Sequence, residues 1–136
     1  MFEKIYLKTQ GHTDFLNITE EVQDIVSKAQ CQEGIIFLFA KGSTCALTTM
    51  EWEEGIKKDV KSVLEKIAPE DFDWQHHKKW GDHNGAAHIR SALMGPDLFI
   101  PFEKGKLTLG AWQSVVFIDF DEKPREREIE VKIICG

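Results

Sequence analysis

The sequence predicts an α+β fold: one compact domain over residues 1–136, with a mostly antiparallel β-sheet and two to three helices. Three observations lead to this prediction. The chain has 136 residues, which suits one domain with a sizeable core. Its composition, 42% apolar and 29% charged, is typical of a globular protein. The expected strands come in groups before, between and after the helices, and this order favours antiparallel pairing.

The N-terminal half is predicted to alternate between strand groups and helices. Residues 2–9 have the alternation of a strand, and a turn at Gly11 leads into residues 15–18, so we expect a β-hairpin. Thr19 has a side chain suited to a helix N-cap, and apolar residues with helical spacing follow it. Residues 35–40 are apolar throughout, which predicts a strand buried on both faces. The half ends with a strand at residues 47–51 and an amphipathic helix from Ile56 to Ile67, stopped by Pro69.

An irregular acidic and aromatic segment, residues 69–80, is expected to precede a further helix. Asn84 is suited to the N-cap of that helix, which runs to Met94 with Gly95 as the stop. Ile89 and Leu93 lie four residues apart, so we expect both to face the core.

The C-terminal part is predicted to contain only strands. Residues 107–120 form the longest candidate, and both of its faces are largely apolar, so we expect a central strand. Gln113 and Asp119 would then lie on a buried or pocket-lining face, where each needs a polar partner. The other two strands are expected at residues 98–102 and 129–135.

Charge and cysteine content exclude several classes of protein. The net charge of -6 argues against a general nucleic-acid binder. No apolar segment is long enough to span a bilayer, and the N-terminus lacks the apolar region of a signal peptide. Cys31, Cys45 and Cys135 are odd in number and widely spaced, so we expect reduced thiols in a cytoplasmic protein.

Polar side chains that could bind a ligand or take part in catalysis concentrate between positions 76 and 90, where four of the five histidines occur. The first turn of the helix after Asn84 presents free backbone N–H groups, which suit an anion. His77, His83 and His88 have the side chains that bind divalent metals, although their spacing matches no zinc signature. The alternative for each histidine is an ordinary hydrogen-bonded or surface role.

Other candidate groups each have two readings. Ser43 and Thr44 are either phosphate ligands or turn residues, and Glu51 is either a base or a solvated carboxylate. Cys45 is better explained as a small core residue than as a nucleophile. Arg125 and Arg127 either hold an anion or, as is usual in a charged turn, stay solvated.

Several motifs occur in a fixed order along the chain: Gly42-Ser43-Thr44-x-Ala46, Asp82-x-Asn84-Gly85-x-x-His88-x-Arg90, Leu107-x-Leu109-Gly110-x-Trp112-Gln113, Asp119-Phe120-Asp121 and Arg125-x-Arg127. Together they resemble the YjbQ-like family, small proteins described as secondary thiamine-phosphate synthase enzymes. The resemblance covers essentially the whole chain.

The resemblance implies a compact α+β fold, a homotrimer, and a pocket built from a histidine, an Asn…His pair and the Trp-Gln segment. In this chain those positions are His77, Asn84, His88 and Gln113, with Glu51 close by. His77 and His88 are the implied ligands of a divalent metal, either zinc or magnesium. The chain departs from the family pattern because many members have a histidine at the position of Ser43. Members with Gly-Ser-Thr there often have Gly and His where this chain has His83 and Ala86.

Three functions remain open. The leading hypothesis, implied by the resemblance, is a transferase that joins a pyrimidine diphosphate to a thiazole phosphate. The residues that bind phosphate or metal would be Ser43, Thr44, Asn84, His88 and Arg90. His77 would move a proton, and Glu51 would lie close to the reacting groups. Gln113 would line the pocket, and Trp112 would provide a stacking surface. The second hypothesis is a metal-dependent phosphohydrolase that uses the same pocket. The third is a non-catalytic trimer that binds a small ligand or metal.

Overall fold

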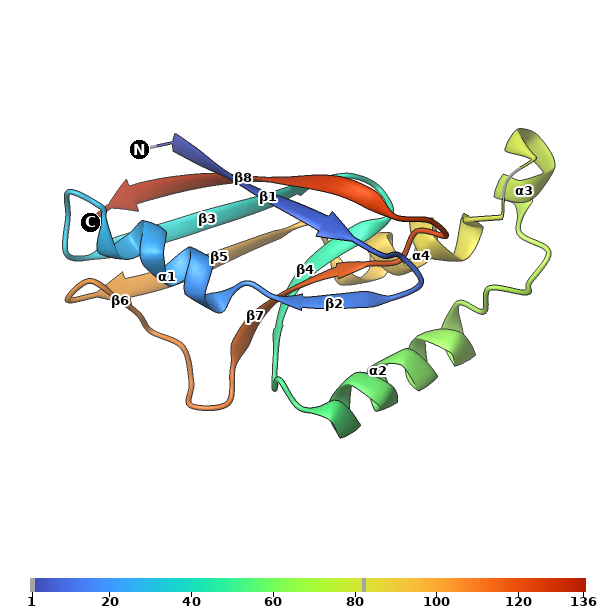
Figure 1. Cartoon of the computed structure of the whole chain (residues 1–136), viewed down its shortest axis with the longest axis horizontal. Coiled ribbons are helices and arrows are strands. Elements are labelled where there is room, and N and C mark those ends of the chain that lie inside the picture. Colours follow the sequence, from blue (N-terminus) through green and yellow to red (C-terminus); the bar gives the residue numbers. More distant parts are fainter. Residues whose placement is uncertain (1, 82) are drawn as a thin grey trace.

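The computed structural model describes residues 2–81 and 83–136 and contains two antiparallel β-sheets and four helices (Figure 1). The strands are β1 (Phe2–Thr9), β2 (Asp14–Asn17), β3 (Gly34–Lys41), β4 (Cys45–Met50), β5 (Asp97–Glu103), β6 (Lys106–Leu107), β7 (Ser114–Asp119) and β8 (Arg125–Cys135). The helices are α1 (Thr19–Ser27), α2 (Glu54–Ile67), α3 (Gln75–Trp80) and α4 (Gly85–Met94). The α+β class is confirmed. The number of helices was underestimated because α3 forms within the segment expected to be irregular.

The strands divide into a five-stranded sheet, ordered β1-β8-β3-β5-β6, and a three-stranded sheet, ordered β2-β7-β4. The expected hairpin of the first two strands is therefore wrong. β1 pairs with β8 in the first sheet, whereas β2 pairs with β7 in the second. The chain changes sheets at a corner where Gly11, His12 and Thr13 all have positive φ angles, of 84°, 54° and 63°. Three successive residues at positive φ exceed the two of a type I′ hairpin turn, and the chain leaves the first sheet at this corner.

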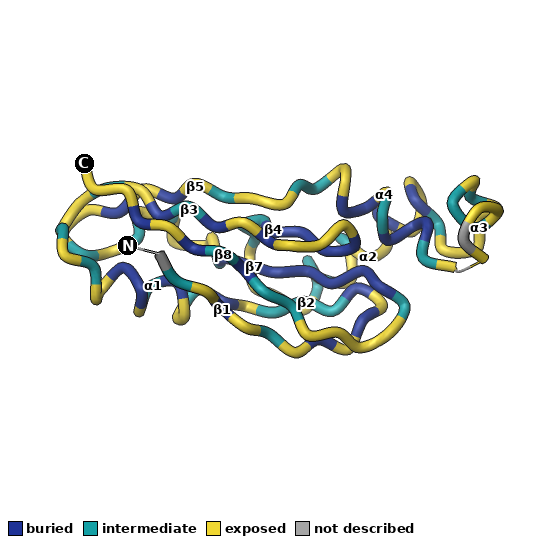
Figure 2. Tube along the Cα trace, turned by 90° about the horizontal axis from the view of Figure 1, so that it is seen from above, coloured by how far each residue is buried: buried dark blue, intermediate teal, exposed yellow. Residues whose placement is uncertain are grey.

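The main core lies on the inner face of the five-stranded sheet. Ile36 and Leu38 of β3 are fully buried there, together with Ile129 and Val131 of β8. The opposite face of β3 is only partly covered, and Phe39 keeps 38% of its surface exposed. The expectation that this strand is buried on both faces is therefore wrong for the single chain. Figure 2 shows the alternation of buried and exposed residues along it.

The long strand expected at residues 107–120 is interrupted. Strand β6 ends at Leu107 and β7 begins at Ser114, and the segment between them is a loop. The Gln113 side chain organises this loop, because its Oε1 accepts a hydrogen bond from the Gly110 N–H (2.8 Å) and its Nε2 donates to Thr49 Oγ1 (3.1 Å). Gln113 is therefore exposed rather than buried, while Asp119 at the other end of β7 is fully buried, as expected.

Two of the three cysteines form a disulfide. Cys31 follows α1, Cys135 ends β8, and their Cα atoms are 5.9 Å apart, so the expectation of three reduced thiols is wrong. The pair is separated by 104 residues, and only the pairing of β8 with β3 brings it together. Cys45 is free and buried. A cytoplasmic location stays a prediction.

Helix α4 begins after Asn84 and ends before Gly95, as predicted, but it faces the core with a different side. Ala86, Ala87 and Arg90 are buried, whereas Leu93 is 62% exposed. The small side chains allow close packing on the three-stranded sheet, where Ser91 Oγ donates to the Cys45 carbonyl (2.6 Å). Ile89 is also partly exposed, so the expectation that Ile89 and Leu93 face the core is wrong. No helix among the described residues is long and apolar enough to cross a membrane.

Candidate active site at the N-terminus of helix α4

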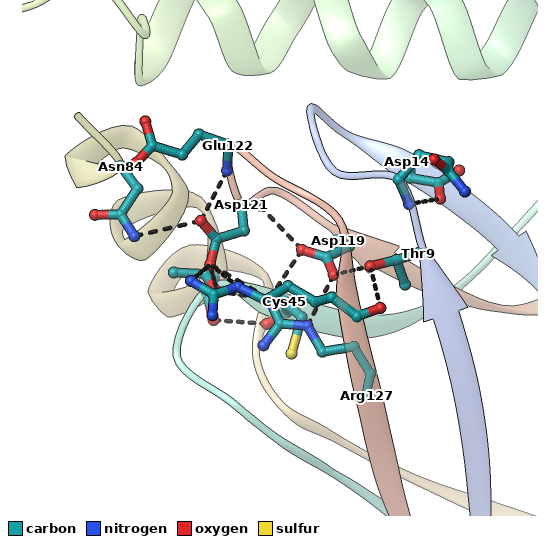
Figure 3. A network of polar contacts seen from close by, with 12 residues as sticks. Thr9, Asp14, Cys45, Asn84, Asp119, Asp121, Glu122 and Arg127 are labelled. Atoms are coloured by element: carbon teal, nitrogen blue, oxygen red, sulfur yellow. Dashed lines mark hydrogen bonds and ion pairs between the residues drawn. The ribbon is translucent and has the colours of Figure 1, made fainter. Parts of the chain in front are cut away.

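A buried ionic network lies where β7 and β8 meet the loop between β3 and β4 (Figure 3). Arg127 donates two hydrogen bonds to the Asp119 carboxylate, from Nε (2.8 Å) and Nη2 (2.9 Å), and a third to Thr44 Oγ1 (2.7 Å). Thr9 Oγ1 also donates to Asp119. Arg127 belongs to β8 and is largely buried, so the solvated reading of this residue is wrong.

Asp121 extends the network towards α4. Its Oδ2 accepts hydrogen bonds from Thr44 Oγ1 (2.9 Å) and Arg125 Nε (3.0 Å), and its Oδ1 accepts one from Asn84 Nδ2 (3.4 Å). Burial raises the pKa of both Asp119 and Asp121, but hydrogen bonds and positive charge outweigh burial and hold each pKa below its ordinary value. Both carboxylates are therefore ionised at neutral pH.

Cys45 borders the same network. Burial raises the pKa of its thiol to about 11, although the charge of Arg127 opposes this shift. A thiol with such a pKa is protonated at neutral pH and is a poor nucleophile. The reading of Cys45 as a core residue agrees with this environment.

Asn84 holds the N-cap position of α4 without capping it. Its side-chain nitrogen is turned to Asp121, and among the described residues its buried Oδ1 has no hydrogen-bond partner. The cap is supplied by His77 instead, because the Gly85 N–H donates to His77 Nε2 (3.1 Å). A Cβ at Gly85 would lie 2.8 Å from the Trp74 Cβ, so only glycine allows this contact.

The four neighbouring histidines form three ring contacts, and the contact between His76 and His77 has a centroid distance of 6.4 Å. The ring centroids of His76 and His88 are 4.5 Å apart, and those of His77 and His83 are 5.3 Å apart. No group of three or more His, Cys, Asp or Glu side chains among the described residues is arranged to hold a metal ion. The lone pair of His77 Nε2 is engaged by the Gly85 N–H, and the ring proton is then on Nδ1, so His77 has no lone pair left for a metal in this conformation. Asp82, part of the same motif, lies outside the described residues.

A cavity of about 200 Å³ lies at the start of α4, and we call it the Asn84 cavity. Three carboxylates line it, so its character is acidic, and its two imidazoles belong to His12 and His83. The full lining is His12, Glu70, Asp71, His83, Asn84, Ala86, Ala87, Phe120 and Glu122.

His12 is a residue of this cavity that the sequence pattern did not single out. The left-handed corner places His12 at the cavity. The backbone N–H of His12 donates to the Asp121 carbonyl (2.7 Å), and Nδ1 of its ring lies 4.0 Å from Glu70 Oε1. A signal was present in the sequence, since Gly11 immediately precedes it and favours a left-handed conformation. A non-glycine residue held at positive φ is a frequent feature of functional sites.

The remaining predicted site residues are not all near this cavity. Arg90 is buried, and its guanidinium donates to the Ala68 carbonyl (2.8 Å), Thr13 Oγ1 (3.2 Å) and Glu65 Oε2 (2.8 Å). These bonds tie α4 to α2 and to the corner. Ser43 is exposed in the β3–β4 loop next to the network.

Glu51, Trp112 and Gln113 lie at the opposite end of the three-stranded sheet. In the β4–β7 pairing, Met50 faces Ser114 and Cys45 faces Asp119, so the six residues of β7 separate the two ends. A six-residue strand is roughly 20 Å long. Within one chain, the residues expected to share one pocket therefore form two separate groups. Trp112 is 77% exposed.

Comparison with known proteins agrees with this fold along the whole chain. The family model described as UPF0047 protein YjbQ-like matches residues 3–136. A UPF0047 protein of Archaeoglobus fulgidus is 32% identical over 96% of this chain and 99% of its own length, and UPF0047 protein YugU of Bacillus subtilis is 27% identical over 98% and 99%. The crystal structure of a YbjQ-like protein of unknown function from Sulfolobus solfataricus superposes with a TM-score of 0.93 at 29% identity, covering 100% of this chain and 97% of that one. An uncharacterised YjbQ/UPF0047 protein from Clostridium acetobutylicum gives a TM-score of 0.88 at 33% identity, covering 97% and 99%. The chain therefore belongs to the YjbQ-like UPF0047 family.

Proposed function

We propose that this protein is a divalent-cation-dependent enzyme that acts on a phosphorylated small molecule. The reaction to test first is the joining of a pyrimidine diphosphate to a thiazole phosphate with release of pyrophosphate. The observation that carries the proposal is the convergence of carboxylate, imidazole and amide groups on the Asn84 cavity. Several polar groups that converge on one cavity are a general mark of a binding or active site.

The donor atoms of the cavity are of the kind that a divalent cation prefers. No three of the described carboxylates or imidazoles are arranged to hold a cation by themselves, so a bound cation would complete its coordination with phosphate oxygens and water. Glu70, Asp71 and Glu122 offer carboxylate oxygens, and Asn84 offers a buried carbonyl oxygen that lacks a partner among the described residues. Because Asp121 engages the amide nitrogen, the Asn84 oxygen is turned away from the network (Figure 3). An oxygen-rich lining favours magnesium over zinc. A bound cation would neutralise phosphate charge and stabilise a departing pyrophosphate.

The protein's own residues would position the substrate and move protons. His88 lies one helical turn after Asn84, so both side chains project from the same end of α4. His77 holds the first turn of α4 through the Gly85 N–H and thereby keeps Asn84 in place. We assign proton transfer to His88, because it lies one helical turn from Asn84 on the helix that borders the cavity.

Hydrolysis is the second candidate, and the size of the cavity favours it. About 200 Å³ is smaller than the roughly 300–1,000 Å³ of typical ligand pockets. One phosphate group and a water molecule need much less space than two heterocycles. A metal-dependent phosphohydrolase would therefore fit the single chain without further residues.

We also propose that the chain assembles as a homotrimer. Exposed apolar side chains on the outer face of the five-stranded sheet support this, since Phe37 and Phe99 contact each other with ring centroids 4.7 Å apart and Phe99 is largely exposed. Neighbouring apolar side chains that are exposed together commonly mark a protein–protein interface. Phe99→Glu should lower the molar mass measured by light scattering from that of a trimer to that of one chain, and an unchanged mass would exclude this face as the interface.

The test compares Asn84→Ala with Gln113→Ala, which removes an amide from the far end of β7. Each protein is assayed with added magnesium for thiamine phosphate formation and for phosphate release from a panel of phosphoesters. We expect Asn84→Ala to weaken magnesium binding and activity by about 10- to 100-fold, as removal of metal-site groups generally does. Gln113→Ala should be nearly unaffected.

The outcomes separate the hypotheses. Thiamine phosphate formation supports the transferase, and phosphate release without it supports the hydrolase. Equal losses in the two variants would show that the far end of β7 also serves the site, which a single chain cannot achieve. Stoichiometric ligand or metal binding with no turnover would favour the non-catalytic alternative.

A further inference from the structure

A second cavity, of about 250 Å³, lies between α2 and β2, and we call it the lysine cleft. Lys57, Lys58 and Lys61 line it from the helix, and Thr13, Asp14 and Phe15 line it from the strand side. The protein as a whole carries a net charge of -6. Three lysines around one cavity are therefore a local reversal of the overall charge.

The three lysines are not equivalent. Lys57 is largely buried, its Nζ lies 2.6 Å from Glu54 Oε1, and it lies 4.1 Å from the centroid of the Trp52 ring. Lys57 therefore neutralises Glu54, which also lines the cleft. Lys58 and Lys61 are exposed, and neither forms an ion pair within the part of the chain that the structure describes. They lie three residues apart on the same side of α2.

The acidic groups of the cleft are already engaged. Asp14 Oδ2 accepts a hydrogen bond from the Gln10 N–H (2.8 Å). The hydrogen bond from Lys57 and then the charges of Lys57, Lys58 and Lys61 lower the pKa of Glu54. All three lysines therefore contribute to a positive potential at this point, which favours an anion.

The arginines around the Asn84 cavity do not offer an equivalent group. Arg90, Arg125 and Arg127 each form short ion pairs with carboxylates, at 2.8 to 3.0 Å. The adjacent residues His12 and Thr13 line one cavity each. An acidic cavity and a cationic cleft therefore flank the same corner of the chain.

We propose that the lysine cleft binds the phosphate or diphosphate group of a small molecule through Lys58 and Lys61. The Phe15 ring lines the cleft as an apolar surface, and the Lys61 Nζ lies 5.7 Å from its centroid. The inference goes beyond the proposed reaction and does not depend on it, since anion binding needs neither turnover nor a metal.

The experiment is calorimetric titration with pyrophosphate in metal-free buffer of low ionic strength. The wild-type protein should bind it, and Lys58→Gln/Lys61→Gln should weaken the affinity by about tenfold or more, because two charge-assisted contacts are lost. The control is Lys28→Gln/Lys66→Gln, which removes the same charge from exposed positions outside the cleft and should bind nearly as the wild type does. Thermal unfolding of each variant checks that the fold is unchanged.

Three results would overturn the assignment: no binding by the wild type, equal affinity in the cleft variant, or an equal loss in the control. Asn84→Ala is the further comparison. If it alone abolishes pyrophosphate binding, the anion binds in the Asn84 cavity and not in the lysine cleft. Retained binding in Asn84→Ala together with lost enzyme activity would show that the two sites are distinct.

Discussion

Replacing Arg127 by methionine is expected to destabilise the protein strongly. The guanidinium donates two hydrogen bonds to Asp119 and one to Thr44, and Asp119 is completely buried. Methionine keeps most of the apolar stem but removes every one of these bonds. Water cannot replace them at a buried position, so the carboxylate would be left inside the protein without its counter-charge.

The expected cost follows from this geometry. Breaking a buried ion pair by removing one partner costs about 3–5 kcal/mol, a large part of the roughly 5–15 kcal/mol that stabilises a domain. With a urea dependence of about 2 kcal/mol per molar, the unfolding midpoint should fall by about 2 M. The matched control is Lys41→Met, because Lys41 is half exposed and its Nζ lies 2.7 Å from Glu128 Oε2. Such a surface pair is worth about 0–1 kcal/mol.

The assay is urea unfolding of wild type, Arg127→Met, Lys41→Met and the double variant Asp119→Leu/Arg127→Met. The double variant should be more stable than Arg127→Met, because it no longer buries an unpaired carboxylate. Equal shifts for Arg127→Met and Lys41→Met would refute the reasoning, since they would mean that Asp119 has no special dependence on Arg127.

Three further predictions concern titration and covalent chemistry. The pKa values of Asp119 and Asp121 in the folded protein lie below their values in the unfolded chain. Their contribution to stability is therefore complete above the unfolded pKa and is lost as the pH falls through the folded pKa. Urea midpoints should decrease from about pH 6 down to about pH 2, and a constant midpoint would contradict the assignment. Reduction of the disulfide between Cys31 and Cys135, which are 104 residues apart, should cost up to about 4–5 kcal/mol by the chain-entropy argument, seen as a lower melting temperature with reductant. Cys45, with a pKa of about 11, should resist alkylation at pH 8 in the native protein and react in denaturant.

Much of the local structure could be predicted from the sequence. The bounds of α4 and the end of α2 before Pro69 agree with the structure, because glycine, proline and apolar periodicity act within a few residues. The antiparallel α+β class follows from the order of these elements. The clustering of His77, Asn84 and His88 was equally accessible, since these residues are close in the sequence.

Pairings between distant segments were not accessible in this way. The separation of β1 from β2 depends on the left-handed corner and on partners about 100 or more residues away, and no local pattern encodes it. The interruption before β7 depends on the Gln113 side chain, which replaces strand pairing with bonds to Gly110 and Thr49. The apolar pattern of the sequence does not show that side-chain hydrogen bonds replace strand pairing at this point.

The composition of the candidate site was decided only by the tertiary structure. The sequence determined that histidines and Asn84 would meet at a helix N-terminus, because one turn of helix is a local event. It did not show that His12 enters the same cavity, that Arg90 is already bonded, or that Gln113 lies at the far end of β7. Those outcomes depend on which surfaces pack together, since packing brings together side chains from segments far apart in the sequence and satisfies each buried charge with whichever partner lies within reach.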